Sequence, residues 1–166
     1  MLPPDPAGFF FAGMAVQVLA DAAATGGELS VCAIAAPPDT ATPLHRHTLE
    51  DEIVVVHAGT LSVRVHGAQA RTLGPGDSVL LPREVPHRLV TGPAEEARFL
   101  AVWSPGGFEA ALAAAGSPDA AEAADPDDVA ALFAGAGVWL LPDPGGPAAR
   151  GSTLPGRYAA RPDPRT

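Results

Sequence analysis

The sequence predicts an all-β fold, an antiparallel sandwich or barrel, with a short helical extension towards its C-terminal side. Between residues 9 and 103, short runs of β-branched and aliphatic residues recur at regular intervals, with Gly, Pro and Asp between them. After Trp103 the sequence becomes rich in Ala and carries residues that start and stop helices. The chain has 166 residues, which suffice for one sizeable core but not for two.

The expected strands follow one another along the first segment. Residues 61–66 alternate apolar with polar side chains, so Leu61, Val63 and Val65 should face the core. A hairpin tip is expected at Gly67, directly after that strand. The other expected strands are residues 29–35, 71–73, 78–81, 88–90 and 98–103. With the less regular runs included, roughly eight short strands are expected in this segment.

Two short helices are expected after the barrel. The first should begin with Ser104 as N-cap and Pro105 in the first turn, and it should end at Gly116. The second should begin with Asp125 as N-cap, again followed by proline, and end in a glycine-containing segment. Residues 138–141 are apolar and should form a short strand or an anchor.

These boundaries divide the chain into three parts. Residues 1–104 should form the barrel, and residues 105–141 should form a helical extension packed on it. Residues 142–166 consist largely of Pro, Gly, Ala and Arg with little to bury, which predicts a flexible tail. The alternative for this last part is a lid that Tyr158 helps to dock.

The composition excludes several classes of partner and site. With 19 acidic against 10 basic residues the formal net charge is -9, so nucleic acids and anionic membranes would be repelled. The single cysteine, Cys32, excludes an internal disulfide and a thiolate metal cluster, and we expect it to be buried as a small apolar residue. Neither a secretory signal nor an apolar span of about 20 residues is present, so a soluble cytoplasmic protein is expected.

Four polar residues could bind one metal ion. His45 and His47 are two residues apart, so their rings would share one face of a strand. Glu52 opens the apolar run of residues 53–56, and His87 starts another expected strand. Three imidazoles and one carboxylate suit one divalent transition metal, namely Fe, Ni, Co, Mn or Zn. Such a site would leave coordination positions for water or substrate.

Each of these residues also has a simpler interpretation. His45 and His47 could belong to a solvated polar loop, because Pro43 and Arg46 lie beside them. Glu52 could be the end of a surface acidic run, and His87 could be a polar residue at the entry to a strand. The spacing of the four residues is what favours the metal site.

The first half of that spacing resembles the first motif of the cupin superfamily. In that motif a histidine, one residue and a second histidine are followed after a few residues by a glutamate, and then by a glycine. His45, His47 and Glu52 stand at the first three positions, and Gly59 follows Glu52 after six residues. The agreement is complete at these four positions.

The second half resembles the second cupin motif. Gly76, Pro82 and His87 stand at its glycine, proline and histidine positions. Glu84 stands where the family has a glycine, and Thr91 stands where the family often has an asparagine. These departures affect a turn and a position outside the ligand set, so all four ligand positions are retained.

The resemblance implies a cupin-type double-stranded β-helix, a jelly-roll barrel, with the metal inside it and His45, His47, Glu52 and His87 as ligands. Because of the helical continuation after the barrel, the chain resembles the small single-domain bacterial cupins described as quercetin 2,3-dioxygenase-like. That resemblance implies a metal-dependent dioxygenase acting on an enolisable aromatic or polyketide-like small molecule. Glu52 would then be the catalytic base as well as a ligand.

Two other functions remain open for the same four residues. One is a non-redox cyclase, isomerase or lyase of the cupin fold, in which the metal polarises a carbonyl and no oxygen is consumed. The other is a cupin that binds a small molecule without catalysis. Oxygen uptake separates the dioxygenase from both alternatives.

The substrate pocket is expected among apolar side chains near the motifs, chosen by strand parity or by position. These residues are Val54, Val56, Leu61, Val63, Val79, Leu81, Leu89, Phe99 and Trp103. Such a wall would favour a flat or aliphatic organic molecule over a sugar phosphate.

The N-terminal residues predict a homodimer. Residues 9–11 are three consecutive phenylalanines, which cannot all face one small core. The resemblance supports this expectation, because cupin relatives commonly exchange or pair their N-terminal strands.

Overall fold

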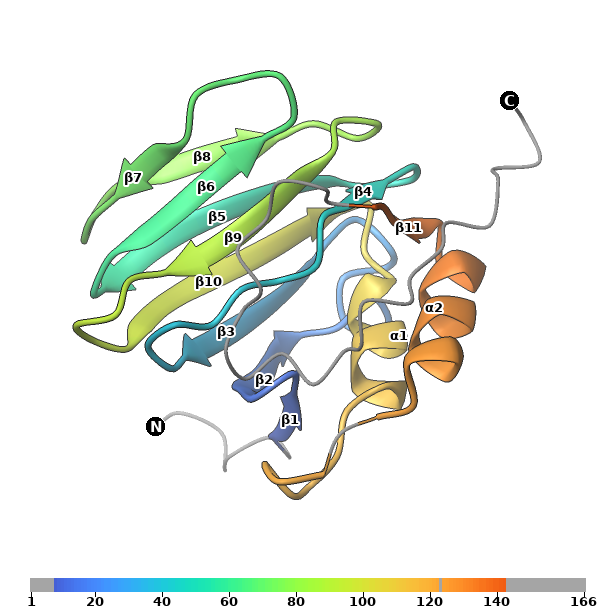
Figure 1. Ribbon diagram of the computed structural model, residues 1–166. Helices are drawn as coiled ribbons and strands as arrows, with labels where there is room; N and C mark the ends of the chain where they lie inside the picture. Colours follow the sequence, from blue (N-terminus) through green and yellow to red (C-terminus); the bar gives the residue numbers. More distant parts are fainter. Residues whose placement is uncertain (1–7, 123, 143–166) are drawn as a thin grey trace.

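The computed structural model describes residues 8–122 and 124–142, which form two antiparallel sheets with two helices at one end (Figure 1). The strands are β1 (Phe9–Phe11), β2 (Met14–Ala20), β3 (Ser30–Ala36), β4 (His45–His47), β5 (Asp51–Ala58), β6 (Leu61–Val65), β7 (Arg71–Leu73), β8 (Ser78–Leu81), β9 (His87–Thr91), β10 (Ala97–Ser104) and β11 (Val138–Leu140). The helices are α1 (Phe108–Ala114) and α2 (Pro126–Gly135). No helix among the described residues is long and apolar enough to cross a membrane.

The strand order is that of a jelly roll, which confirms the predicted fold class. One sheet has the order β1-β2-β3-β10-β5-β8 and the other has the order β11-β4-β9-β6-β7. From β3 to β10 the chain passes repeatedly from one sheet to the other, as in a double-stranded β-helix. Figure 1 shows α1 and α2 beside β1 and β11, at the end of the molecule away from β7.

Strand alternation places a single core between the sheets. Strands β5 and β10 lie side by side, with Val54 opposite Ala101 and Glu52 opposite Trp103. All four side chains are buried, while the residues between them are more exposed. Leu61 and Val63 are buried as predicted, and the aromatic and aliphatic side chains of the helices extend this core. The inward positions of the strands therefore point into the space where a site can be enclosed.

Gly59 forms the turn between β5 and β6. Its φ of 69° lies in the left-handed region that favours glycine. A Cβ atom at this position would lie 2.2 Å from the carbonyl oxygen of Glu96, which is a steric clash with backbone. The left-handed backbone and the close carbonyl oxygen together explain why a glycine is needed at position 59. The next turn glycine, Gly67, follows eight positions later.

The first helix begins later than predicted. Ser104 is not an N-cap but the last residue of β10, where it pairs with Asp51 of β5. Its hydroxyl donates to the carbonyl oxygen of Glu28 at 2.9 Å. The helix begins at Phe108. Sheet pairing, which a local sequence pattern does not contain, therefore outweighs the capping signal.

Glu109 in α1 is a buried carboxylate that connects the helix to the loop after β2. It is 4% exposed. Its two carboxylate oxygens accept hydrogen bonds from the backbone N–H groups of Ala22 and Gly107, both at 2.8 Å. Burial by itself would raise the pKa of Glu109, but these hydrogen bonds hold it below its ordinary value.

The second helix begins as predicted. Asp125 is the N-cap, and its side chain accepts hydrogen bonds from the backbone N–H groups of Asp127 and Asp128 at 2.8 and 3.4 Å. Val129 and Phe133 are buried on the inner face of this helix.

The extension also contributes a strand to the barrel. Strand β11 pairs with β4, so that Val138 lies opposite His47 and Leu140 lies opposite His45. The predicted helical extension is thus joined to the sheet through the strand that carries two histidines. Residues 143–166 of the predicted tail, including Tyr158, lie outside the described residues.

Candidate metal centre

Four side chains from three strands meet inside the barrel. His45 and His47 come from β4, Glu52 from β5 and His87 from β9. One ligand atom of each residue lies within 4.8 Å of the corresponding atoms of the other three. His45 is 9% exposed, and the other three side chains are more deeply buried. The structure therefore brings together all four residues that the motifs single out.

Strand pairing sets the relative positions of the rings. His45 lies directly opposite His87 in the β4–β9 pairing, with ring centroids 4.5 Å apart. His47 is two residues further along β4 and therefore faces the same side, with its ring stacked 5.9 Å from that of His87. Glu52 reaches the cluster from the opposite sheet. A bound ion would thus connect the two sheets.

Two of the histidines are oriented by backbone carbonyl groups. The Nδ1 atom of His45 lies 2.8 Å from the carbonyl oxygen of Pro43, and Nδ1 of His87 lies 2.9 Å from that of Val85. A carbonyl oxygen can only accept a hydrogen bond, so each Nδ1 carries the proton. The lone pair of a neutral ring is then on Nε2, the atom available to a metal.

The third histidine is oriented by a carboxylate that sequence reasoning missed. Nδ1 of His47 lies 3.2 Å from Oε2 of Glu50, and Glu50 is only 3% exposed. In the sequence Glu50 begins the acidic run of residues 50–52, a pattern that is typical of a solvated surface. The sequence did contain a signal for its burial. Side chains alternate between the two faces of a strand, so Glu50, two residues before Glu52, points inward with it. Asp51, between them, instead pairs with Arg83 at 3.0 Å on the outside.

The facing lone pairs fit a metal ion. Nε2 of His87 lies 3.1 Å from Oε2 of Glu52, and Nε2 of His47 lies 3.4 Å from the same oxygen. If each ring carries a proton on Nδ1 alone, these nitrogens and the carboxylate are all acceptors, so either a second ring proton or a metal cation has to lie between them. Nε2 of His47 is buried and has no hydrogen-bond partner in the described structure. Three imidazole nitrogens and one carboxylate suit a divalent transition metal.

The pKa values of His45 and Glu52 are shifted in directions that suit metal ligands. Burial, followed by the neighbouring charges of His87 and His47, lowers the pKa of His45 to about 3, so this ring is neutral near neutral pH. Burial alone would raise the pKa of Glu52, but the neighbouring imidazoles of His47 and His87 hold it well below its usual range. Glu52 is therefore a carboxylate.

His47 differs from His45 in its protonation. Burial by itself would lower its pKa, but the carboxylates of Glu50 and Glu52 raise it to about 9. Without metal, a proton on this ring balances part of the buried negative charge. A divalent cation would take over that balance, because Glu50 and Glu52 together carry two negative charges.

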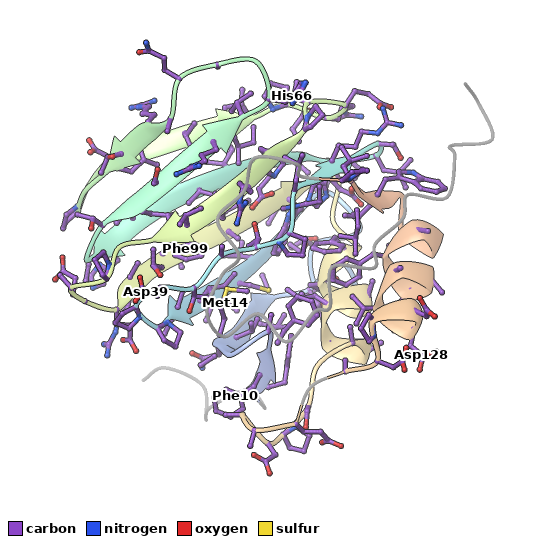
Figure 2. The ribbon with its side chains drawn as sticks, viewed as in Figure 1. Phe10, Met14, Asp39, His66, Phe99 and Asp128 are labelled. Atoms are coloured by element: carbon purple, nitrogen blue, oxygen red, sulfur yellow. The ribbon has the colours of Figure 1, made fainter. Side chains whose placement is uncertain are left out.

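An apolar pocket opens beside the cluster. It encloses about 60 Å³, and its wall is almost entirely hydrocarbon. The lining residues are Phe11, Met14, Ile34, Thr42, Pro43, His45, His47, Glu52, Leu89, Phe99, Trp103, Phe108, Leu112, Phe133 and Leu140. Figure 2 labels two of them, Met14 from β2 and Phe99 from β10. The helices complete this wall, because the ring of Phe108 packs edge-on against His47 at 4.9 Å and against Phe133 at 5.0 Å.

Three of the nine residues predicted for the pocket wall lie in this lining, namely Leu89, Phe99 and Trp103. The other six do not line the pocket: five are buried in the barrel core, and Val79 is partly buried against it. They are Val54, Val56, Leu61, Val63, Val79 and Leu81. The wall residues from α1 and α2 could not be selected by strand parity, because they come from the extension. His66 lies exposed near the tip of the β6–β7 hairpin and is not one of the four residues of the cluster (Figure 2).

Cys32 takes no part in the site. It is fully buried in β3, as predicted. Burial, with a smaller contribution from the charge of Glu109, raises the pKa of its thiol to about 12. A thiol in that state is neither a ligand nor a nucleophile near neutral pH.

The structure shows what Glu84 and Thr91 do at the two positions where the chain departs from the second motif. Glu84, at the glycine position, has a φ of 65°, so the left-handed turn is kept although the residue carries a side chain. That side chain pairs with Arg46 at 3.3 Å. Thr91, at the asparagine position, donates from its hydroxyl to the carbonyl oxygen of Pro37 at 2.7 Å and accepts from the backbone N–H of Thr40 at 2.8 Å. Thr91 therefore fixes a loop and does not contact the four-residue cluster.

Comparison with known proteins agrees with the fold and the motifs. Residues 34–103 match the model of the Cupin domain family. This segment contains all four residues of the cluster. No curated protein matches the chain significantly.

Solved structures with similar folds share low sequence identity with the chain. A cupin-like protein from Thermotoga maritima is 25% identical with a TM-score of 0.52, over 55% of this chain and 68% of that chain. KdgF from Halomonas sp. is 21% identical with a TM-score of 0.53, over 59% and 84%. The polyketide cyclase RemF from Streptomyces resistomycificus is 24% identical with a TM-score of 0.51, over 62% and 70%. At these identities KdgF and RemF show the fold alone.

Proposed function

We propose that this chain, which contains a cupin superfamily domain over residues 34–103, is a metal-dependent dioxygenase that acts on a small enolisable molecule. One observation carries the proposal. The three histidines and Glu52 converge within 4.8 Å beside an apolar pocket, so a metal held there would be open to a substrate but shielded from bulk water. The helical continuation after the barrel, which resembles that of quercetin 2,3-dioxygenase-like cupins, supports the same reaction class.

The residues of the cluster would have different roles in the reaction. A divalent metal bound here would supply a Lewis acid and, where it is redox-active, a path for electrons to dioxygen. His45 and His87 are fixed by backbone carbonyl groups on Nδ1, which leaves Nε2 of each ring available to the metal. Glu52 is the carboxylate that lines the pocket, so it is positioned to accept the proton that an enol loses. It would serve as ligand and base.

The pocket wall restricts the substrate class. Its apolar surface favours a compact hydrocarbon skeleton with few oxygen atoms over a sugar or a phosphate. Nε1 of Trp103 is buried with no hydrogen-bond partner among the described residues, and Trp103 lines the pocket. A substrate oxygen would satisfy this donor. With about 60 Å³ enclosed, a molecule as large as a flavonol would need Phe108 and Phe133 to move, whereas a small 1,3-diketone would need less movement.

Metal reconstitution followed by oxygen uptake tests the proposal. The purified chain is loaded separately with Fe(II), Ni(II), Co(II), Mn(II) and Zn(II), and bound metal is measured by elemental analysis. Oxygen consumption is then recorded with a small 1,3-diketone and with a flavonol. We expect one equivalent of metal per chain, and oxygen uptake with at least one redox-active metal.

Two variants separate metal binding from catalysis. His47→Ala removes a ligand, so it should lose both metal and activity. Glu52→Gln keeps an oxygen donor but removes the basic carboxylate, so it should lose activity more than metal. Turnover that continues without oxygen would overturn the dioxygenase in favour of a cyclase, isomerase or lyase. Metal binding without turnover of any tested enol would favour a binding protein.

A further inference from the structure

A second pocket lies on the face of the five-stranded sheet that points away from the metal cluster. It has a volume of about 270 Å³, and its polar side chains are Arg64 on β6, His66 after β6 and Arg88 on β9. Its other described lining residues are apolar. Side chains alternate along a strand, so Arg88 points outward while its neighbour His87 points to the cluster. We define the arginine pocket as the site lined by Arg64, His66 and Arg88.

Two positive charges face each other in the arginine pocket. Arg64 and Arg88 are directly opposite residues in the pairing of β6 with β9. Cβ atoms at such positions are ~4.5–5.5 Å apart, and like charges there destabilise a sheet. Arg88 is only 7% exposed, so water screens this repulsion less than it would on an open surface. An anion bound between the two guanidinium groups would replace the repulsion by attraction.

The described part of the pocket supplies no negative charge. None of its described lining residues carries a carboxylate. The exposed side chain of Arg64 makes no hydrogen bond or ion pair within residues 8–122 and 124–142. Arg46 on β4 does not line the pocket and pairs with Glu84 at 3.3 Å. On a chain with a net charge of -9, this concave site is a local concentration of positive charge that would attract a small anion.

We propose that the arginine pocket binds a phosphate group, either as inorganic phosphate or as the phosphomonoester of a small molecule. A phosphate monoester carries about -1.5 to -2 charges at pH 7, which matches two guanidinium groups. Its tetrahedral oxygens can accept paired N–H donors from both guanidinium forks. The ring of His66, at the turn of the β6–β7 hairpin, provides a third polar contact (Figure 2). A carboxylate has one charge and two oxygens, so it matches only one fork.

Size and charge favour a small ligand. The volume of about 270 Å³ exceeds that of a phosphate group alone and leaves room for a small organic part. A nucleic acid would bring many further phosphates against the acidic remainder of the chain, which would repel them. The pocket also lies on the opposite face of the sheet from the metal cluster, so this proposal does not rest on the proposed function.

An NMR titration of the full chain with inorganic phosphate tests the proposal. Sodium chloride holds the ionic strength constant, and phosphate is added to about 20 mM. We expect saturable shifts of the backbone amides of Arg64, His66 and Arg88, with a dissociation constant of about 1 mM or below. Glycerol phosphate should shift the same amides, which extends the site to phosphomonoesters. Acetate is the carboxylate probe, and it should bind at least about tenfold more weakly.

Three variants locate the binding. Arg64→Gln removes an exposed guanidinium, so it should raise the dissociation constant for phosphate at least about tenfold while the chain stays folded. Arg71→Gln is the matched control, because Arg71 is an exposed arginine on β7 of the same hairpin and does not line the pocket. It should bind phosphate as the wild type does. His47→Ala, which removes a metal ligand, should also bind phosphate normally.

Each outcome decides the proposal. The absence of saturable shifts up to the highest phosphate concentration would overturn it. Equal weakening by Arg71→Gln and Arg64→Gln would also overturn it, because binding would then follow net charge and not the pocket. Equal binding of acetate would overturn the assignment to phosphate. Loss of binding in His47→Ala would place the anion at the metal cluster instead. Failure of the dioxygenase assay changes none of these results, so the two proposals are tested separately.

Discussion

The buried carboxylate of Glu50 accepts the Nδ1 proton of His47 across 3.2 Å, whereas the other two histidines of the cluster donate to backbone carbonyl groups. One of the three imidazoles is therefore oriented by a full negative charge. Such a partner holds the ring in place and makes its Nε2 a stronger donor. The site thus has one ligand position whose properties depend on a residue that does not touch the metal.

Replacing Glu50 should weaken metal binding without removing a ligand. Glu50→Gln keeps an acceptor for the Nδ1 proton of His47 but removes the charge, and loss of such outer partners typically costs about 10–100-fold in metal affinity. Competition with a chromogenic chelator measures the affinity. Asp51→Asn is the control, because it removes a neighbouring charge that faces outward. Equal affinity of Glu50→Gln and the wild type would exclude the positioning role.

The turn glycine Gly59 should tolerate no side chain. Gly59→Ala combines a left-handed backbone with a Cβ atom 2.2 Å from the Glu96 carbonyl oxygen, so we expect a loss of about 3 kcal/mol or more. Gly67→Ala is the matched control, since Gly67 has a φ of 78° but no atom near its Cβ position. Its cost should be about 1–2 kcal/mol. Urea unfolding of both variants gives the steric contribution by difference, and equal losses would contradict the clash.

Restoring the motif glycine at position 84 should stabilise the chain. Glu84 has a left-handed backbone, which costs a residue with a Cβ atom about 1 kcal/mol relative to glycine. Glu84→Ala keeps that cost and removes only the exposed ion pair with Arg46. We therefore expect Glu84→Gly to be more stable than Glu84→Ala in chemical unfolding. If Glu84→Ala were the more stable of the two, backbone strain at this turn would be excluded.

The stability supplied by Glu109 should depend on pH. Its folded pKa lies below the ordinary value of 4.5, so its contribution is present above that value and is lost as the pH falls through the folded pKa. Glu109→Gln should lower the free energy of unfolding by about 1–3 kcal/mol near neutral pH. The difference from the wild type should shrink in acid, as measured by denaturant unfolding at a series of pH values. A difference that stays constant with pH would contradict this.

Much of the fold could be predicted because the strands are short and alternate regularly. The boundaries of β7 and β8 agree with the sequence prediction, and so does the start of α2, where Asp125 acts as a local cap. These features depend on residues close together in the chain. The start of α1 was misplaced, because Ser104 pairs with a strand whose position no local pattern reveals.

The candidate site was predictable in its ligands but only partly in its surroundings. The four ligand positions follow from two spaced motifs, and the structure brings them together. Glu50 was missed because an acidic run normally indicates solvent exposure. Most of the pocket wall was also missed, since Phe108 and Phe133 reach it from helices that follow the whole predicted barrel in the sequence. Contacts of that kind depend on tertiary packing.

The pairing of β11 with β4 has a consequence for the order of events during synthesis. The strand bearing His45 and His47 acquires its second neighbour only when Val138 and Leu140 have left the ribosome. Until then that three-residue segment has an unpaired edge, and the wall formed by Phe133 is also incomplete. Tight capture of a cation should therefore be a late step of maturation, and a nascent chain that stops short of residue 138 should release the ion easily.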